Sequence, residues 1–218
     1  TYVFHFAAQA GVPYSLVNPQ KYFDTNITGY FNLILSINKK NLKKIIYASS
    51  SSVYGEQKKY PTPENTMLNA KNPYANSKVI NERISEILSE AYDIKFIGLR
   101  FFTVYGEWGR PDMFIMKLLN CIYKNKTFHL NNNGDHYRDF TYISDIVKSC
   151  EKLITYKPKL SHTIFNICAG KKINILQLTQ KILRDYPNAK IKNISANKAD
   201  VYQTLGSNKK IVKELKLK

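Results

Sequence analysis

The sequence predicts an α/β protein built on a doubly wound parallel sheet. Three short apolar runs, at residues 2–6, 43–50 and 94–102, are rich in β-branched or aromatic residues and read as buried strands. Longer segments with a helical period separate these runs, so strands and helices alternate. With 218 residues, of which 44% are hydrophobic, the chain is large enough to bury a substantial core.

The first half of the chain is expected to hold three strands and two helices in strict alternation. Asn18 is placed to cap the first helix ahead of Pro19. In the second helix, apolar side chains recur at helical spacing. The expected elements are a strand at 2–6, a helix at about 18–38, a strand at 43–50, a helix at about 74–92 and a strand at 94–102.

Beyond residue 106 the alternation loosens into a smaller, mixed lobe. No low-complexity linker precedes it, so we expect residues 107–218 to interleave with the sheet formed by 1–106, with 143–167 returning to that sheet. The expected elements are a helix near 113–124, short strands around 127–130 and 137–142, a helix at 143–156, a strand at 162–167 and a helix at 174–185.

Composition limits the classes of partner. The formal net charge is +17, but the lysines are scattered and no arginine-rich block occurs, which favours a solvated surface over a nucleic-acid site. Cys121, Cys150 and Cys168 share no short spacing, so neither a disulfide framework nor a metal site is indicated. No apolar run reaches the ~18 residues of a membrane span. We expect a cytoplasmic protein without nucleic-acid, membrane or metal partners.

Tyr74 and Lys78 stand four residues apart, on one face of the expected helix at 74–92. A phenol with a pKa near ~10 is a poor base, and lowering that pKa by two units takes about 2.7 kcal/mol. A nearby ammonium can supply part of this, and a serine hydroxyl from the segment ASSSSVYG can complete a donor network around a reacting oxygen. The same spacing also arises by chance, as an aromatic stem beside a solvated lysine.

Five segments strengthen the catalytic interpretation, because they occur in a suitable order and spacing. Together they resemble an extended short-chain dehydrogenase/reductase of the nucleotide-sugar epimerase/dehydratase family, and within it the UDP-glucuronate 4-epimerases. The resemblance extends to about residue 205. The segments are HFAAQAGV, YASSSSVYG, PYANSK, LRFFTVYGEWGRPDM and RDFTYISDI.

The resemblance implies a Rossmann-like fold, NAD as the cofactor and a UDP-sugar as the substrate. By resemblance, residues 1–106 are the remainder of an NAD-binding domain, and 107–218 mainly bind the nucleotide sugar. Tyr74 is implied as the catalytic base, Lys78 as the cation that lowers its pKa and holds the nicotinamide ribose, and Ser50 as the third member of the triad.

The resemblance also implies contacts with the two ligands. Asn26 could instead be a buried, satisfied amide, and Asp200 a solvated loop carboxylate. Cofactor contacts are expected from Phe6, Ala7, Ala8, Asn26, Tyr74, Lys78 and Phe102. Substrate contacts are expected from Ser51, Ser52, Thr103, Arg110, Arg138 and Asp200.

Ser51 and Ser52 narrow the reaction. Related 4,6-dehydratases carry an Asp-Glu pair at these two places, and elimination of water needs such an acid and base, whereas epimerisation at C4 does not. The expected reaction is therefore 4-epimerisation, of UDP-glucuronate first and of UDP-glucose or UDP-N-acetylglucosamine as the alternative. A homodimer formed through the helices at 18–38 and 74–92 is also implied.

Two features depart from the family. No glycine-rich phosphate loop occurs, and the chain begins at what resembles the fourth strand, which suggests a fragment lacking the first strands. Pro13 stands where close relatives carry Arg. A truncated, inactive binding protein with a basic surface, which would meet an acidic partner, is the alternative from another class.

Overall fold

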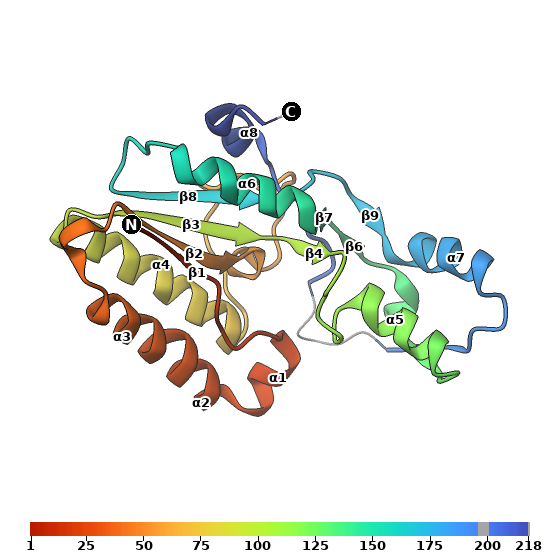
Figure 1. The fold of residues 1–218 in the computed structure, drawn as a ribbon. Helices are drawn as coiled ribbons and strands as arrows, with labels where there is room; N and C mark the ends of the chain where they lie inside the picture. Colours follow the sequence, from red (N-terminus) through yellow and green to blue (C-terminus); the bar gives the residue numbers. More distant parts are fainter. Residues whose placement is uncertain (196–200, 218) are drawn as a thin grey trace.

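A four-stranded, all-parallel sheet organises the protein, whose computed structural model describes residues 1–195 and 201–217. The strand order is β1-β2-β3-β8, so each later strand adds to the same side (Figure 1). The strands are β1 (Tyr2–His5), β2 (Lys44–Ser50), β3 (Lys95–Phe101) and β8 (His162–Ile167).

Helices cover both faces of this sheet, as a doubly wound fold requires. On one face, α3 (Gly29–Ser36) and α4 (Pro73–Ala91) enclose a core that includes Tyr30 and Phe96. On the other face, α6 (Ile143–Thr155) and α8 (Lys209–Leu215) pack on β3 and β8 (Figure 1). The predicted fold class is confirmed.

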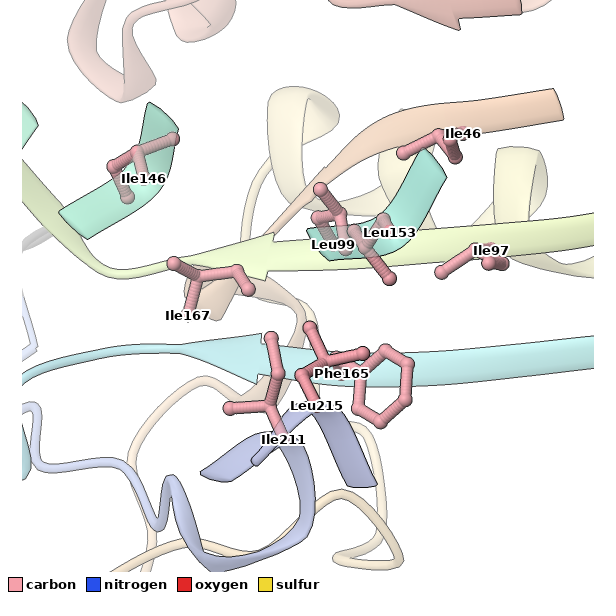
Figure 2. Packing of buried hydrophobic residues seen from close by; sticks show 9 residues of the cluster. All are labelled: Ile46, Ile97, Leu99, Ile146, Leu153, Phe165, Ile167, Ile211 and Leu215. Carbon is pink, nitrogen blue, oxygen red and sulfur yellow. The ribbon is translucent and has the colours of Figure 1, made fainter. Parts of the chain in front are cut away.

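Figure 2 shows the second of these cores, in which apolar side chains from the sheet meet those of α6 and α8. Full burial of a Leu, Ile or Phe side chain contributes about 1.5–3 kcal/mol, so this cluster anchors both helices. Its members are Ile46, Ile97, Leu99, Ile146, Leu153, Phe165, Ile167, Ile211 and Leu215.

A smaller lobe is built from short strand pairs and two helices around a core of Leu118, Phe128, Leu130 and Ile175. Within residues 1–195 and 201–217 these pairs are parallel β5–β10, parallel β4–β7 and antiparallel β6–β9. The lobe elements are β4 (Thr103–Tyr105), α5 (Phe114–Tyr123), β5 (Phe128–Asn131), β6 (Tyr137–Arg138), β7 (Phe140–Tyr142), β9 (Ile173–Asn174), α7 (Ile175–Asp185) and β10 (Ile191–Ile194).

The structure refines the expected elements at two places. The helix expected at 18–38 is α2 (Pro19–Tyr22), a π-helical segment η1 (Phe23–Thr28) and α3. The strand expected at 137–142 is interrupted at Asp139, whose carboxylate accepts backbone N–H groups from Ala169, Gly170 and Gly206 at 3.0–3.1 Å. These bonds fasten the chain between β6 and β7 to two distant loops.

Several short elements lie outside the expected set, and most have little hydrophobic periodicity. They include α1 (Val12–Val17), β10 and α8, together with the short 3₁₀ turns η2 (Lys39–Asn41), η3 (Ser51–Tyr54) and η4 (Asn132–Gly134). Among the described residues, no helix combines the length and apolar character needed to cross a bilayer.

Candidate active site

A large cavity of about 1340 Å³ lies beyond the carboxyl ends of β2 and β3, where ligands bind in open parallel sheets. Strand-end residues form one part of its wall, and side chains of the smaller lobe form another. Most of the sequence-predicted site residues line it: Phe6, Ala8, Ser50, Ser51, Ser52, Tyr74, Lys78, Phe102, Thr103, Arg110 and Arg138.

The first turn of α4 carries Tyr74 into this cavity. The Asn72 side chain caps the helix by accepting the N–H of Ala75 at 2.9 Å, and Pro73 occupies the first turn, where no N–H partner is needed. The helix therefore begins directly before Tyr74. Lys78 follows one turn later on the same face, as the sequence predicts.

The pKa of Tyr74 is raised above its ordinary value of 10.0. Burial is the main cause, while a side-chain hydrogen bond with Ser50 and the positive charge of Arg110 both act to lower the pKa. The two hydroxyls that were predicted to work as a pair therefore lie near each other at the cavity wall. In this structure, then, Ser50 and Arg110 oppose the effect of burial on the phenol.

Lys78 is almost fully buried, and its Nζ donates a hydrogen bond to the carbonyl oxygen of Ala48 at 2.9 Å. Burial lowers its pKa to about 8, because desolvation disfavours the ammonium. The expected lowering of the Tyr74 pKa by Lys78 stays a prediction for the NAD-bound protein.

The three serines after β2 lie together at the cavity wall. Ser50 ends the strand, and its Oγ accepts the N–H of Ser52 at 3.2 Å, which caps the short turn η3. This turn folds Ser51 and Ser52 back so that all three residues line the cavity. This part of the cavity wall therefore presents three hydroxyl groups.

The segment after β1 is held by a buried amide. Asn26 accepts the N–H of Gln9 at 2.8 Å and donates to the carbonyl of Gln9 at 2.9 Å and to Ser77 Oγ at 3.0 Å. Among the described residues Phe6 and Ala8 line the cavity, whereas Ala7 and Asn26 do not. The geometry thus favours the satisfied-amide interpretation of Asn26, which positions this segment against α4.

Phe102 and Thr103 follow β3 directly and face the cavity. Behind Phe102 lies Gly206, where an added Cβ would come within 2.5 Å of Phe102 Cζ and 2.7 Å of Cys168 Sγ. Only glycine permits this approach, so the C-terminal segment fixes the position of the Phe102 ring from behind.

The two predicted arginines lie in different settings. Arg110 forms a two-pronged ion pair with Asp112, with Nε–Oδ1 at 3.0 Å and Nη2–Oδ2 at 2.5 Å, and both side chains are about half exposed. Arg138 donates to the carbonyl of Tyr137 at 2.8 Å. Asp200 lies outside the described residues, while its neighbour Val201 lines the cavity.

Several polar residues of the cavity wall were not predicted. The lysines were overlooked because lysines scattered along a sequence usually lie on the solvated surface. The histidines were overlooked because their spacing suggests no metal site. No metal-binding group of three or more His, Cys, Asp or Glu side chains occurs in the described part of the chain. These residues are Lys71, Trp108, Asp112, Lys117, His129 and His136.

A family model described as the NAD dependent epimerase/dehydratase family matches residues 1–168. The chain belongs to this family. It is 40% identical over 191 residues to an uncharacterized protein of Methanocaldococcus jannaschii, covering 87% of this chain and 58% of that protein. It is also 44% identical over 155 residues to UDP-glucuronate 4-epimerase 4 of Arabidopsis thaliana, covering 69% of this chain and 36% of that protein.

Solved structures of family members share the fold. The UDP-glucuronic acid 4-epimerase from Bacillus cereus, in complex with UDP-glucuronic acid and NAD, superposes with a TM-score of 0.91 at 27% identity, covering all of this chain and 69% of that one. The UDP-glucose 4-epimerase from Thermotoga maritima, with UDP-glucose, gives the same TM-score and identity, covering 100% and 71%. The chain spans about half the length, or less, of its curated relatives.

Proposed function

We propose that the protein catalyses NAD-dependent 4-epimerisation of a UDP-sugar, with UDP-glucuronate as the substrate. The observation that carries the proposal is the grouping of Ser50, Tyr74 and Lys78 at one cavity, where Ser50 is close enough to Tyr74 to act on the pKa of its phenol. This grouping suits removal and return of a proton at a sugar hydroxyl. Family membership and the named 4-epimerase relatives support the same reaction.

The acidic residues of the cavity wall argue against elimination of water. Among the described lining residues the carboxylates are Glu107 and Asp112, and both have partners. Glu107 accepts the hydroxyl of Tyr142 at 2.8 Å, and Asp112 pairs with Arg110. A dehydratase needs a carboxyl pair beside the sugar. Ser51 and Ser52 supply hydroxyls instead, which can hold a C6 carboxylate without removing it.

A neutral UDP-sugar is the second candidate. Asp112 already neutralises Arg110. Pro13 stands where close relatives carry Arg. The cavity therefore offers less positive charge to bind the C6 carboxylate of a glucuronate. The similarity to the UDP-glucose 4-epimerase structure equals that to the glucuronate enzyme. The two candidates differ in whether a C6 carboxylate is accepted.

The residues fit NAD at the sheet end of the cavity. Phe6 and Phe102 offer apolar surface, Ala8 adds no bulk, and the buried Lys78 ammonium suits the hydroxyls of a ribose. When bound, NAD supplies the hydride acceptor and donor of the reaction.

The protein side chains move and hold the proton. Tyr74 takes the proton of the sugar 4-hydroxyl, Ser50 donates to the same oxygen, and Lys78 favours the phenolate. After rotation of the sugar, Tyr74 returns the proton as C4 is reduced on its other face. Arg138 and the lysines of the wall would hold the diphosphate meanwhile.

The expected homodimer is part of this proposal. Large apolar side chains remain exposed along the segment from η1 through α4, among them Phe31 and Leu35 on α3 and Ile87 on α4. We expect Leu35→Glu to convert the dimer to a monomer in sedimentation experiments. Val147→Glu on α6, a similarly exposed position on the opposite face, should leave the dimer intact. Monomeric behaviour of the parent protein would contradict the proposal.

The test of the reaction is a product assay. The protein, expressed with any coding sequence that precedes Thr1, is incubated with NAD⁺ and UDP-glucuronate, and NMR follows formation of UDP-galacturonate. Tyr74→Phe should reduce turnover at least ~100-fold, because the substitution removes only the phenolic oxygen.

Three outcomes would change the proposal in whole or in part. Turnover of UDP-glucose or UDP-N-acetylglucosamine without turnover of UDP-glucuronate would establish the neutral-sugar candidate. Failure of a folded parent protein to convert any of the three would refute the epimerase assignment. Full activity in Tyr74→Phe would refute the role of Tyr74 alone.

A further inference from the structure

A buried ion pair lies on the face of α4 that carries Tyr74 and Lys78, one helical turn beyond Lys78. Arg100 on β3 and Glu82 on α4 meet in two hydrogen bonds, Nε–Oε1 at 2.8 Å and Nη2–Oε2 at 2.7 Å. Their side chains are only 5% and 6% exposed, so neither charge is hydrated. A pair this deeply buried persists only if every donor and acceptor has a partner.

The third guanidinium nitrogen of Arg100 is engaged as well. Nη1 donates to the hydroxyl of Tyr54 at 2.8 Å and to the carbonyl of Glu64 at 2.9 Å. Tyr54 in turn donates to Asn166 Oδ1 on β8 at 2.7 Å. The network therefore ties α4 to β3, to β8 and to the loop after β2.

Buried ion pairs are poor sources of stability, because desolvation consumes most of their attraction. Apolar residues of equal volume often stabilise a fold as well or better. What an ion pair offers instead is direction, since a guanidinium and a carboxylate bind in one fixed plane. This makes a role in alignment more reasonable than a role in stability.

The network reaches the catalytic residues through Ser49. Its Oγ donates to Glu82 Oε1 at 2.5 Å, and the next residue along β2 is Ser50. One turn earlier on α4, Lys78 donates to the carbonyl of Ala48. The helix that carries Tyr74 is thus fixed to β2 at the two residues immediately before Ser50.

We propose that Ser49, Glu82 and Arg100 form a positioning unit, which holds α4 against the end of β2 so that Tyr74 and Ser50 stay within hydrogen-bonding reach. Glu82 and Arg100 do not line the cavity, and Ser49, which does, has its hydroxyl engaged by Glu82. The assignment of the unit rests on the proposed function. It acts on the chemical step, because a displacement of about 1 Å between reacting groups can cost ~100-fold in rate. Substrate binding depends on other walls of the cavity.

Ser49→Ala tests the unit, and Ser85→Ala is its matched control. Ser85 is also a fully buried serine. It lies on α4, three residues beyond Glu82, and its hydroxyl forms a hydrogen bond with the Tyr30 hydroxyl at 2.6 Å. Each substitution removes one buried hydroxyl, so both should weaken the fold similarly. We expect Ser49→Ala to lower kcat ~10-fold with KM within about twofold, and Ser85→Ala to leave both within about twofold.

A second readout does not depend on substrate. The pKa of the Lys78 ammonium, about 8 when buried, can be followed by NMR with ¹³C-labelled lysine. Loosening of α4 from β2 admits water, so Ser49→Ala should raise this pKa toward the ordinary 10.5, while Ser85→Ala should not. Lys78→Met assigns the signal.

The outcomes separate the two proposals. If the folded parent converts no UDP-sugar but only Ser49→Ala changes the titration of Lys78, the proposed function fails and the positioning unit stands. If Ser49→Ala and Ser85→Ala agree in kcat and in the titration of Lys78, the hydroxyl of Ser49 is merely structural and the positioning unit is overturned.

Discussion

A buried lysine lies at each end of β2: Lys44 is part of the strand, and Lys78 reaches its carboxyl end from α4. The two ammonium groups make different numbers of hydrogen bonds. At the amino end, Lys44 donates to the carbonyls of Leu153 at 2.7 Å, Ile154 at 3.0 Å and Tyr156, which closes the last turn of α6. At the carboxyl end, Lys78 donates to the single carbonyl of Ala48 and borders the cavity. One lysine caps a helix, and the other remains available to a ligand.

The difference follows from the direction of the strands. In an open parallel sheet ligands bind at the carboxyl ends, so a cation there is kept for the ligand at a cost in stability. At the amino ends the same cation meets the negative end of a helix, where it stabilises the fold. Burial lowers the pKa of both lysines, so the pKa direction alone does not distinguish a functional lysine from a structural one.

The largest expected effect is on Lys78. Lys78→Met should reduce kcat at least ~100-fold, because the phenolate of Tyr74 loses its cation. The same change should stabilise the fold at pH 7. The pKa of Lys78 is about 8 in the folded protein, and its ordinary value is 10.5. Below pH 8 the ammonium must be buried charged, at a cost of the order of 3 kcal/mol.

The sign of the pH dependence follows from this depressed pKa. Between about pH 8 and 10.5 the unfolded chain binds a proton that the folded protein has released, so stability rises with pH across this window. Loss of the hydrogen bond to Ala48 offsets about 1 kcal/mol. We expect Lys78→Met to gain about 1–3 kcal/mol in urea unfolding at pH 7, and less at pH 10.

Lys44→Met provides the control, since it removes the buried lysine at the other end of β2. It leaves three carbonyls at the end of α6 without this donor, so the fold should lose about 2–3 kcal/mol. Its kcat should stay within about twofold of the parent. If the two substitutions shift the free energy of unfolding in the same direction, the contrast between the two ends of β2 is wrong.

Much of the sheet half is predictable because its signals are local. The expected strand at 162–167 coincides with β8. The expected helix at 74–92 differs from α4 by one residue at each end, and the one at 143–156 differs from α6 only at its last residue. Apolar runs and helical periods mark these elements directly. The strand-end rule then places Ser50, Tyr74 and Lys78 near one another without knowledge of any contact.

The positioning unit was missed because its signal is a conflict and not a motif. Arg100 interrupts the apolar run IKFIGLRFF, and a charge inside a buried strand requires a buried partner. Glu82 lies on the helical face of Tyr74 and Lys78, at spacings of eight and four residues. Taken together, these two facts would have predicted an ion pair between Arg100 and Glu82. The π-helical segment η1 carries no comparable signal in the sequence.

The smallest expected effect concerns Arg138, on the side of the cavity that the smaller lobe forms. Arg138→Ala should raise the dissociation constant of UDP about 10–100-fold, because a guanidinium on a diphosphate contributes roughly 1.5–3 kcal/mol. Its kcat should change less than about threefold, since the proton and hydride steps take place at the strand ends. Calorimetric titration with UDP, beside saturating kinetics, separates the two quantities.

Arg184→Ala is the matched control, because Arg184 is an exposed arginine of the same lobe in the last turn of α7. It should alter neither quantity. Salt screens the attraction between Arg138 and the diphosphate, so raising the salt concentration should narrow the difference in the dissociation constant of UDP between Arg138→Ala and the parent. Arg184→Ala should show no such narrowing. A loss of kcat in Arg138→Ala at saturating substrate would show that the lobe takes part in the chemical step, and the division between strand-end chemistry and lobe-side binding would then be wrong.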